Sequence, residues 1–377
     1  MSYCSEECCF PVTIGSYGTE QQFWTAGDYG PTIGVSLDNT TFFAAIRQTT
    51  SINRFFGVYT VDGTTISERS TLQLSVGFGI FPSIAKMTST RVLVGFTTNG
   101  TWGLWLIDVS DLDDPTELDY DDGTGVIGSG ENATSLYRLT DTTAVAFYDD
   151  DVSGGYYAVV IDISGDTISY GTPVALGVST NQYGAMAVLS STLFVVAAVD
   201  TVGLYSVSGT TLTLEDTVGV ESTTAFDAMS GMVKIDDETV LLVYEDDNAG
   251  TDKIYANTYS VTGGNTLTAN TRIEVDSGTR IFAGPQGGKG IALGNRQGLF
   301  VYSRQDGTIA DPHLLVLSVD ESNAITLEAA VDKVGIGDHP TLLMMENTNN
   351  TKAVLITQDS TTTPADQVTM IVLNGAA

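Results

Sequence analysis

Apolar and polar residues alternate along this chain in short runs that are typical of β-strands. In a recurring unit, an apolar residue precedes a short polar turn, usually with Thr, and an apolar strand follows the turn. No stretch keeps the three- and four-residue apolar spacing of an amphipathic helix. Val, Ile, Thr, Tyr and Phe, which favour strands, are well supplied. The pattern predicts an all-β protein.

The apolar residue that opens each unit, here called the anchor residue, recurs at a nearly constant spacing. Successive anchors lie 50, 52, 50, 46, 58 and 52 residues apart. Strand-like runs such as "YAVVIDISG" and "DTISYGT" follow the anchor-bearing strands and give four strands per unit. A period near fifty residues with four short strands is typical of β-propeller blades. Seven anchors therefore predict a seven-bladed ring: Leu37, Met87, Leu139, Leu189, Ile235, Leu293 and Met345.

The two ends of the chain are expected to close this ring. Only 32 residues follow Met345, which leaves the last blade one strand short. The tetrapeptide "SYGT" stands at residues 16–19, ahead of the first anchor, and again at residues 169–172, in a fourth strand. Residues 10–19 are therefore predicted to be the outer strand of the last blade, which removes the exposed edges of an open array. An open stack or a pair of β-sandwiches with coincidental spacing is the alternative interpretation.

Loop lengths predict two unlike faces of the disc. Tight turns such as "TDTT" and "SGDT" join first to second and third to fourth strands, and both kinds fall on one face, here called the turn face. The second-to-third loops are longer and share the opposite face, the loop face, with the blade-to-blade connections. Acidic residues are concentrated on the loop face, including Asp359 and Asp366. The candidate binding residues there are Asp149, Asp150, Asp151, Asp246, Asp247, Asp252, Asp306 and Asp311.

Residues 1–9 are interpreted as a tail that precedes a single propeller domain at residues 10–377. The tail leads into the expected fourth strand, so it emerges on the turn face. It holds every cysteine of the chain, Cys4, Cys8 and Cys9. Three cysteines within six residues fit a zinc site with a further ligand, disulfides to a neighbouring chain, or packed thiols. Because an odd number favours an intermolecular partner, we interpret the three as a docking contact.

Net charge narrows the classes of partner. The chain carries 46 acidic and 15 basic residues, for a net charge of −31, which repels nucleic acids and anionic membranes. No apolar run is as long as a membrane span, and the first residues lack the pattern of a secretory signal. Neither nucleic-acid binding nor membrane insertion is expected. The composition is typical of an outward-facing β protein, so we expect a place in an extracellular particle.

Enzyme motifs are incomplete in this sequence. "GTGVIGSG" has the GxGxxG spacing at Gly123, Gly125 and Gly128, but no helix is predicted after it. His313 and His339 lie in unrelated settings without a nucleophile elbow. "TTNGTW" resembles the Asp-box turn of sialidase propellers but lacks its Asp. The sequence therefore favours a protein without enzymatic activity.

Two aromatic runs are predicted to be core rather than ligand-stacking surface. Propeller blades pack on their neighbours, so the large rings of a strand are expected between two blades. The runs are "TWGLWLID", with Trp102 and Trp105, and "GGYYAVVID", with Tyr156 and Tyr157.

Calcium is the one cofactor for which the sequence offers candidates. "DDDVSGG" and "EDDNAGTD" place oxygen ligands close to Gly, and hard cations favour such sites. Neither loop matches the EF-hand or the DxDxDG repeat of integrin-type propellers, and solvated acidic hairpins are the alternative. The weak calcium candidates are Asp149, Asp151, Asp246 and Asn248.

The chain resembles the closed seven-bladed β-propeller class over its whole length, without the Gly-His and Trp-Asp signatures of WD40 repeats or the kelch pattern. Units such as "LTDTTAVAFYDD" followed by "YAVVIDISGDTISYGT" resemble propeller repeats in virion and fibre proteins of tailed viruses. The resemblance implies a non-enzymatic structural or adhesive component of a viral capsid or tail spike. Such a protein would dock on its particle through the Cys-bearing face and show its acidic loops to a host-surface glycan or receptor.

Two other classes of function stay open. One is a carbohydrate-binding propeller, either a lectin or a glycosidase with paired carboxylates, whose site lies on the loop face. The other is a protein-interaction scaffold.

Overall fold

Every regular element that the computed structural model describes is a β-strand, as the alternating pattern predicts. The structure describes residues 13–17, 21–22, 33–46, 55–74, 83–98, 101–123, 135–150, 155–176, 184–198, 201–220, 226–247, 252–277, 290–306, 309–332, 338–346, 352–359 and 365–374. Within these ranges no helix is long and apolar enough to span a bilayer.

The described strands form seven antiparallel sheets, each made from one sequence unit. The first contains β3 (Ile33–Ser36), β4 (Thr41–Ile46), β5 (Phe55–Asp62) and β6 (Thr65–Gln73), and the second β7 (Ser83–Lys86), β8 (Arg91–Thr98), β9 (Thr101–Asp108) and β10 (Thr116–Asp121). The third contains β11 (Ser135–Arg138), β12 (Thr143–Asp150), β13 (Gly155–Ser164) and β14 (Thr167–Tyr170), with β15 (Val174–Ala175) beside β13.

The next sheets follow the same order. The fourth contains β16 (Ala185–Ser190), β17 (Leu193–Ala198), β18 (Thr201–Ser208) and β19 (Thr211–Gly219), and the fifth β20 (Phe226–Asp236), β21 (Thr239–Asp247), β22 (Asp252–Thr262) and β23 (Thr266–Ser277). The sixth contains β24 (Gly290–Gly294), β25 (Gln297–Asp306), β26 (Ile309–Val319) and β27 (Ile325–Asp332). The last contains β28 (Asp338–Met344), β29 (Lys352–Asp359), β30 (Ala365–Asn374), β1 (Thr13–Tyr17) and β2 (Gln21–Gln22).

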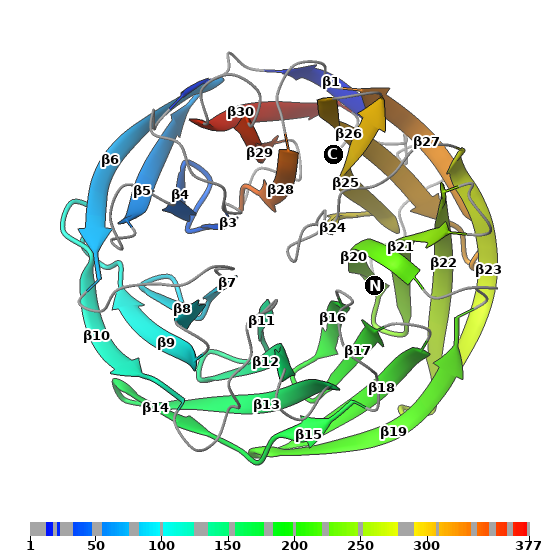
Figure 1. The fold of residues 1–377 in the computed structure, drawn as a ribbon, viewed down its shortest axis with the longest axis horizontal. Coiled ribbons are helices and arrows are strands. Elements are labelled where there is room, and N and C mark those ends of the chain that lie inside the picture. Colours follow the sequence, from blue (N-terminus) through cyan, green and yellow to red (C-terminus); the bar gives the residue numbers. More distant parts are fainter. Residues whose placement is uncertain are drawn as a thin grey trace, which may run out of the picture.

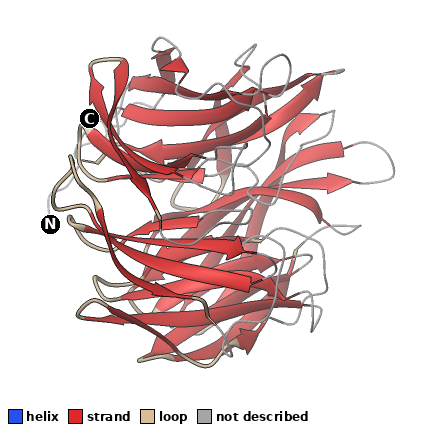
Figure 2. Ribbon diagram, turned by 60° about the vertical axis from the view of Figure 1, so that its left-hand side comes forward, coloured by secondary structure: helices blue, strands red, loops and turns tan. Residues whose placement is uncertain are grey.

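The sheets stand as blades around a central axis, with the first strand of each unit nearest the axis and the fourth at the rim (Figure 1). The all-β propeller of four-stranded antiparallel blades is therefore confirmed. The described turns gather on one side of the disc (Figure 2). This side is the turn face expected from the loop lengths.

Side-chain capping explains why a polar turn follows each anchor. In the first blade the Asp38 carboxylate accepts a hydrogen bond from the Thr40 backbone N–H at 2.7 Å. The hydroxyl or carboxylate one residue after the anchor does the same in four more units, at Thr88, Thr140, Ser190 and Asp236. Such side chains satisfy a backbone donor that the turn leaves unpaired. The recurring Thr, Ser and Asp of the sequence pattern therefore act as turn-forming residues.

The β24–β25 turn is built differently. Its first position is Gly294, which has no side-chain acceptor, and the two residues after it, Asn295 and Arg296, have left-handed φ values of 48° and 58°. Non-glycine residues in this region are uncommon and mark a tight hairpin turn. The unusual turn aims the Arg296 side chain toward the preceding blade.

The apolar core consists of seven clusters, each shared by two neighbouring blades. One cluster, for example, joins Phe43 and Phe56 of blade β3–β6 to Trp105 of blade β7–β10. Trp102 and Trp105 are 2 % and 0 % exposed and lie in two such clusters, and Tyr156 is 1 % exposed in a third, which confirms their assignment to core. The seventh cluster joins blade β3–β6 to β28 and β29, so that the packing continues around the whole ring.

Strand pairing joins the two ends of the chain. β1 lies antiparallel to β30, with Thr13 opposite Asn374, Ile14 opposite Leu373 and Tyr17 opposite Ile371. Ile14 packs against the cluster between blade β24–β27 and the last blade. The N-terminal strand thus has the place that the "SYGT" repeat predicts, since Tyr170 stands in the equivalent fourth strand β14. Thr13 and Asn374 both lie at the turn-face edge of their sheet.

Candidate functional site

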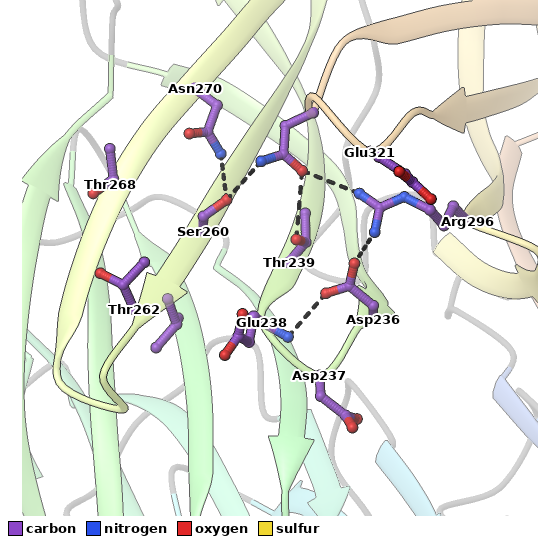
Figure 3. Close-up of a pocket in the computed structure, with 12 residues that line it drawn as sticks. Asp236, Asp237, Glu238, Thr239, Ser260, Thr262, Thr268, Asn270, Arg296 and Glu321 are labelled. Atoms are coloured by element: carbon purple, nitrogen blue, oxygen red, sulfur yellow. Dashed lines mark hydrogen bonds and ion pairs between the residues drawn. The ribbon is translucent and has the colours of Figure 1, made fainter. Parts of the chain in front are cut away.

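A groove of about 780 Å³ lies on the turn face, between blades β20–β23 and β24–β27 (Figure 3). Ligand sites in proteins usually enclose about 300–1,000 Å³. Four turns and strand ends bring its side chains together: Asp236, Asp237, Glu238, Thr239, Ser260, Val261, Thr262, Thr268, Asn270, Arg296, Glu321 and Asn323. We call this pocket the interblade groove.

Arg296 fixes the floor of the interblade groove. Its Nε donates to the Val319 carbonyl at 2.8 Å, and its Nη2 donates to the Asp320 carbonyl at 2.9 Å. Its Nη1 forms an ion pair with the Asp236 carboxylate of the preceding blade. The guanidinium therefore links the two blades, and the Asp236 carboxylate neutralises its charge.

An amide and hydroxyl network continues from Arg296 along one wall. Arg296 Nη2 donates to Asn323 Oδ1 at 3.1 Å, and Asn323 Nδ2 donates to Ser260 Oγ at 3.0 Å. Asn270 Nδ2 donates to the same Ser260 oxygen at 2.7 Å. Asn323 has a left-handed φ of 65°, and its carbonyl accepts from the buried Thr258 hydroxyl. These polar groups are held in fixed positions before any ligand arrives.

The rest of the groove is acidic. Glu238 comes from the β20–β21 turn and Glu321 from the β26–β27 turn, and both side chains belong to exposed residues. Asp237 pairs with Lys234 at 2.6 Å, and this hydrogen bond lowers the pKa of the Asp237 carboxyl. A groove with anionic rims and a hydrogen-bonding wall can bind a cationic or strongly polar segment.

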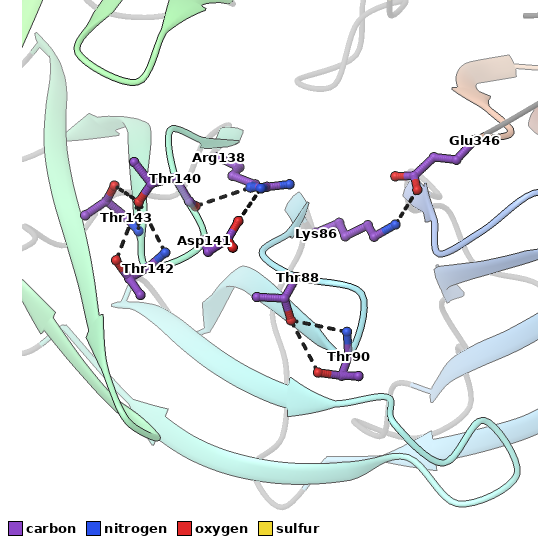
Figure 4. Close-up of polar contacts among 9 residues, drawn as sticks. All are labelled: Lys86, Thr88, Thr90, Arg138, Thr140, Asp141, Thr142, Thr143 and Glu346. Atoms are coloured by element: carbon purple, nitrogen blue, oxygen red, sulfur yellow. Dashed lines mark hydrogen bonds and ion pairs between the residues drawn. The ribbon is translucent and has the colours of Figure 1, made fainter. Parts of the chain in front are cut away.

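Cations also tie other blade junctions together. Lys86, at the end of β7, donates to the Leu37 carbonyl of the preceding blade and to Glu346 of the last blade, both at 2.5 Å (Figure 4). Lys234 donates in the same way to the Leu189 carbonyl. Both lysines stand one residue before an anchor, so one position of the repeat ties a blade to the anchor of its predecessor.

The turn face carries acidic residues as well, which the loop lengths and charges of the sequence did not predict. Its turns carry Asp38, Asp113, Asp141, Asp166 and Asp320, among others. Several of these carboxylates cap backbone N–H groups or pair with Arg across a junction, as Asp113 does with Arg69 at 2.6 Å. These carboxylates therefore stabilise the turns that carry them and the junctions between blades.

The loop-face candidates that the structure describes lie in strands, most of them near a strand end. Asp149 and Asp150 end β12, and Asp247 ends β21 directly opposite Asp252 at the start of β22. Asp306 ends β25, Asp311 lies inside β26, and Asp359 and Asp366 lie in β29 and β30. Asp151 falls outside the described residues. The expected long loop "RQDGTIADPH" is mostly strand, because the ladder of β25 and β26 continues through its polar residues.

Asp246 is the clearest departure from its expected place on an open surface. It is 1 % exposed and pairs at 2.6 Å with Arg272 of β23. The Arg272 guanidinium also lies 3.7 Å from the centroid of the Tyr255 ring. The buried pair stabilises one blade and is not a free binding or calcium ligand.

The metal and cysteine predictions stay untested in part. Among the residues with described side chains, no three His, Cys, Asp or Glu groups converge as a metal site would require. Asp149 lies at the end of β12, while Asn248, Asp151 and the cysteines Cys4, Cys8 and Cys9 lie outside the described residues. His313 is 5 % exposed and lies against the Tyr302 ring, with centroids 4.9 Å apart.

Comparisons with known proteins identify the fold. No family model matches the sequence, and no curated protein sequence is significantly similar to it. The crystal structure of Saccharomyces cerevisiae core factor is similar with a TM-score of 0.54 and 10% identity, over 99% of this chain and 62% of that one. This chain thus spans less than two thirds of that relative.

Two further structures align over most of both chains. Sqt1 from Chaetomium thermophilum gives a TM-score of 0.52 at 11% identity, over 90% of this chain and 85% of that one. The Nup133 β-propeller domain from Vanderwaltozyma polyspora gives 0.54 at 9% identity, over 92% and 100%. At these identities the similarity shows a β-propeller fold.

Proposed function

We propose that this chain is a non-enzymatic protein-interaction module, a closed seven-bladed propeller that holds a partner protein on its turn face within a larger assembly. The observation that carries the proposal is the interblade groove, which is rigidly built from two blades and rimmed by Glu238 and Glu321. Propellers of similar fold in core factor and in the Nup133 β-propeller domain support the use of such a ring as one part of a larger protein system.

The chemistry of the described residues supports binding over catalysis. The amides of Asn270 and Asn323 both donate to the Ser260 hydroxyl, and Arg296 is paired with Asp236, so these groups form a hydrogen-bonding surface rather than a nucleophile with its activating base. Among the described residues that line the groove there is no His. The net charge of −31 favours a partner with a basic contact surface.

Site-specific photo-crosslinking in the native source tests this proposal. A crosslinking residue at position 321, in the groove, should capture one partner, and a matched one at position 214 should not. Leu214 is 48% exposed on the outer strand β19, so it reports contacts made anywhere on the rim. In the chain with the crosslinking residue at position 321, the additional substitution Glu238→Gln should reduce capture, because it removes a further negative charge from the groove. Equal capture at positions 214 and 321 would contradict the proposal.

A carbohydrate ligand is the second candidate, because Ser260, Asn270 and Asn323 form a wall of oriented hydrogen-bonding groups. No aromatic side chain lines the interblade groove, although sugar-binding sites commonly use one for stacking. A glycan array and a hydrolysis screen on the purified protein separate this candidate from a protein partner. The loop-face acids, including Asp149 and Asp306, would be the first residues to substitute if a glycan bound and the groove variants had no effect.

A more specific form of the proposed function places the assembly in a viral capsid or tail. In this form, Cys4, Cys8 and Cys9 are the docking contact. It rests on the resemblance of the repeat units and on the turn-face position of Thr13, from which the preceding tail would reach a particle. Deletion of residues 1–9 should leave a folded ring that no longer joins its assembly. Normal incorporation of the truncated chain would refute this version.

A further inference from the structure

Cations gather at one position of the repeat, at the turn-face ends of the innermost strands. The residue before each anchor is the last or nearly the last of its innermost strand, and these strands surround the central axis (Figure 1). These positions hold three cations and no carboxylate, although acidic residues outnumber basic ones by 46 to 15 in the chain. They are Ser36, Lys86, Arg138, Val188, Lys234, Ala292 and Met344.

Two of these cations line a second pocket of about 270 Å³, here called the channel pocket. Arg138 comes from β11 and Lys234 from β20, and Val188 of the intervening strand β16 lies in the same pocket. Met186 and Met232 supply an apolar lining and are 1 % and 6 % exposed. Methionine side chains adapt to apolar groups of different shape. The channel pocket thus combines an adaptable apolar surface with two positive charges.

Both cations can exchange their present partners for a ligand. Arg138 donates from Nε to the Thr140 carbonyl and pairs through Nη2 with Asp141, while Nη1 donates to none of the described residues. Lys234 pairs with Asp237 and also donates to the Leu189 carbonyl, a contact that it can keep while a ligand replaces Asp237. The side chains of Asp141 and Asp237 are 70% and 92% exposed, and exposed ion pairs contribute little free energy. A ligand carboxylate can replace them at small cost.

The dimensions of the channel pocket favour the end of a polypeptide chain. Its volume lies just below the usual range of about 300–1,000 Å³ for complete small-molecule sites. An apolar side chain and a carboxylate on the same terminal residue would match the methionines and the two cations together. Capture of a C-terminal carboxylate is a known mode of peptide recognition.

We propose that the channel pocket binds the C-terminal carboxylate of a partner polypeptide whose last residue is apolar, with Arg138 and Lys234 as the binding cations. This inference rests on the proposed protein-interaction function. Asp237 of the interblade groove pairs with Lys234 of the channel pocket, so the two sites adjoin on blade β20–β23. One partner segment can reach both.

Fluorescence anisotropy with two synthetic peptides tests the inference. The peptides share a labelled Gly-Ser spacer and a final Leu, and one ends in a free carboxylate while the other ends in an amide. The free acid should bind at least about tenfold more tightly, because only it forms charge-assisted hydrogen bonds with the cations. Arg138→Gln should remove most of that difference, and the fold should survive because the hydrogen bonds of Arg138 to other described residues lie within its own turn.

Arg91→Gln is the matched control. It removes the same charge from the turn face at a residue that contacts Gly165 and Asp166 and does not line the channel pocket, so it should keep the preference for the acid. Equal binding of acid and amide, or no binding of either, would overturn the inference. So would competition by octanoate as strong as that of the unlabelled acid peptide, since the pocket would then bind any small apolar anion. Partner capture at position 321 that Arg138→Gln does not change would overturn this inference alone and leave the proposed function standing.

Discussion

Two blade junctions solve the same packing problem with different chemistry. Between blades β7–β10 and β11–β14, Trp102 stacks near Tyr148 with centroids 6.2 Å apart, and Arg91 reaches forward to the Gly165 carbonyl and to Asp166. Between blades β20–β23 and β24–β27, Arg296 instead reaches backward to Asp236. Both junctions bury aromatic rings, and the second also carries the interblade groove at its turn-face end.

The difference shows how one repeat produces both a scaffold and a site. The forward-reaching Arg91 closes its junction over a tight third-to-fourth turn that ends at Asp166. In blade β24–β27 the corresponding turn is longer and contains Asn323 with a left-handed φ, which joins the network around Arg296. A longer turn on one blade and a reversed arginine therefore open a polar groove without loss of the apolar core beneath it.

The largest expected effect is at the junction between blades β7–β10 and β11–β14. Trp102→Ala should lower the free energy of unfolding by about 3–5 kcal/mol, because a large buried ring is replaced by a cavity. Urea denaturation followed by circular dichroism measures it. Trp102→Phe is the control and should cost much less, since the buried indole N–H has no acceptor among the described residues. A loss below about 1 kcal/mol for the alanine variant would contradict the assignment of Trp102 to the core.

At the polar junction, Arg296→Gly should cost about 1–3 kcal/mol through its lost hydrogen bonds. Arg296→Ala should lower the free energy of unfolding by about 1 kcal/mol more than Arg296→Gly does. The reason is the left-handed φ of 58°, which glycine adopts without strain and alanine does not. At most other positions alanine is the more stable of the two. Denaturation curves of the two variants give the difference directly. An alanine variant more stable than the glycine variant would show that the left-handed turn is not maintained.

A smaller loss of stability is expected at two hydrogen bonds between neighbouring blades, each from a backbone N–H to an Asp side chain. Asp119 Oδ2 accepts the Ile168 backbone N–H of the next blade at 2.8 Å, and Asp216 Oδ2 accepts that of Leu267 at 2.8 Å. Asp119→Ala and Asp216→Ala should each cost about 1–2 kcal/mol, because a backbone donor loses its partner. The Asn variants keep an acceptor oxygen and should cost less. A cost at only one site would show that the two junctions do not share this contact in solution.

The smallest effect is a pH dependence in the turn beside Arg296. Hydrogen bonds from Ser322 and Ala324 hold the pKa of Asp320 below its ordinary 3.8. A lowered folded-state pKa stabilises the protein above the unfolded value, and this contribution is lost as pH falls through the folded value. The stability difference between wild type and Asp320→Asn should therefore be constant near neutral pH and shrink below about pH 3.8. A difference that grows in acid would contradict this assignment.

Local sequence pattern was enough to predict the blades and their closure. The anchors, the capping residues after them and the second "SYGT" are short-range signals, and each records a strand or turn that its own neighbours determine. Trp102 and Trp105 were predictable as core for the same reason, since a propeller buries its large rings between blades.

The site depended on contacts that no local pattern contains. From the sequence, Asp246 is one of a run of acidic residues in a predicted loop. In the structure it lies in β21 and is buried in an ion pair with Arg272 of β23. The groove requires Arg296 to meet Asp236, which is sixty residues earlier. One feature of the sequence did mark the blade that carries Arg296. In "LGNRQ", the turn between its first and second strands, a glycine follows the anchor, whereas five other units have a capping side chain at that position.

Closure of the ring by β1 and β30 has a mechanical consequence. Because Thr13 stands opposite Asn374, a load that draws the two termini apart acts on the first rung of a short ladder and parts it one pair at a time. Strands loaded in this way yield at lower force than strands that must slide along their whole length. An assembly that pulled on the two ends of this protein would therefore separate β1 from β30 first. The other six blades would stay folded, so the β1–β30 pair is the part of the ring that responds to force.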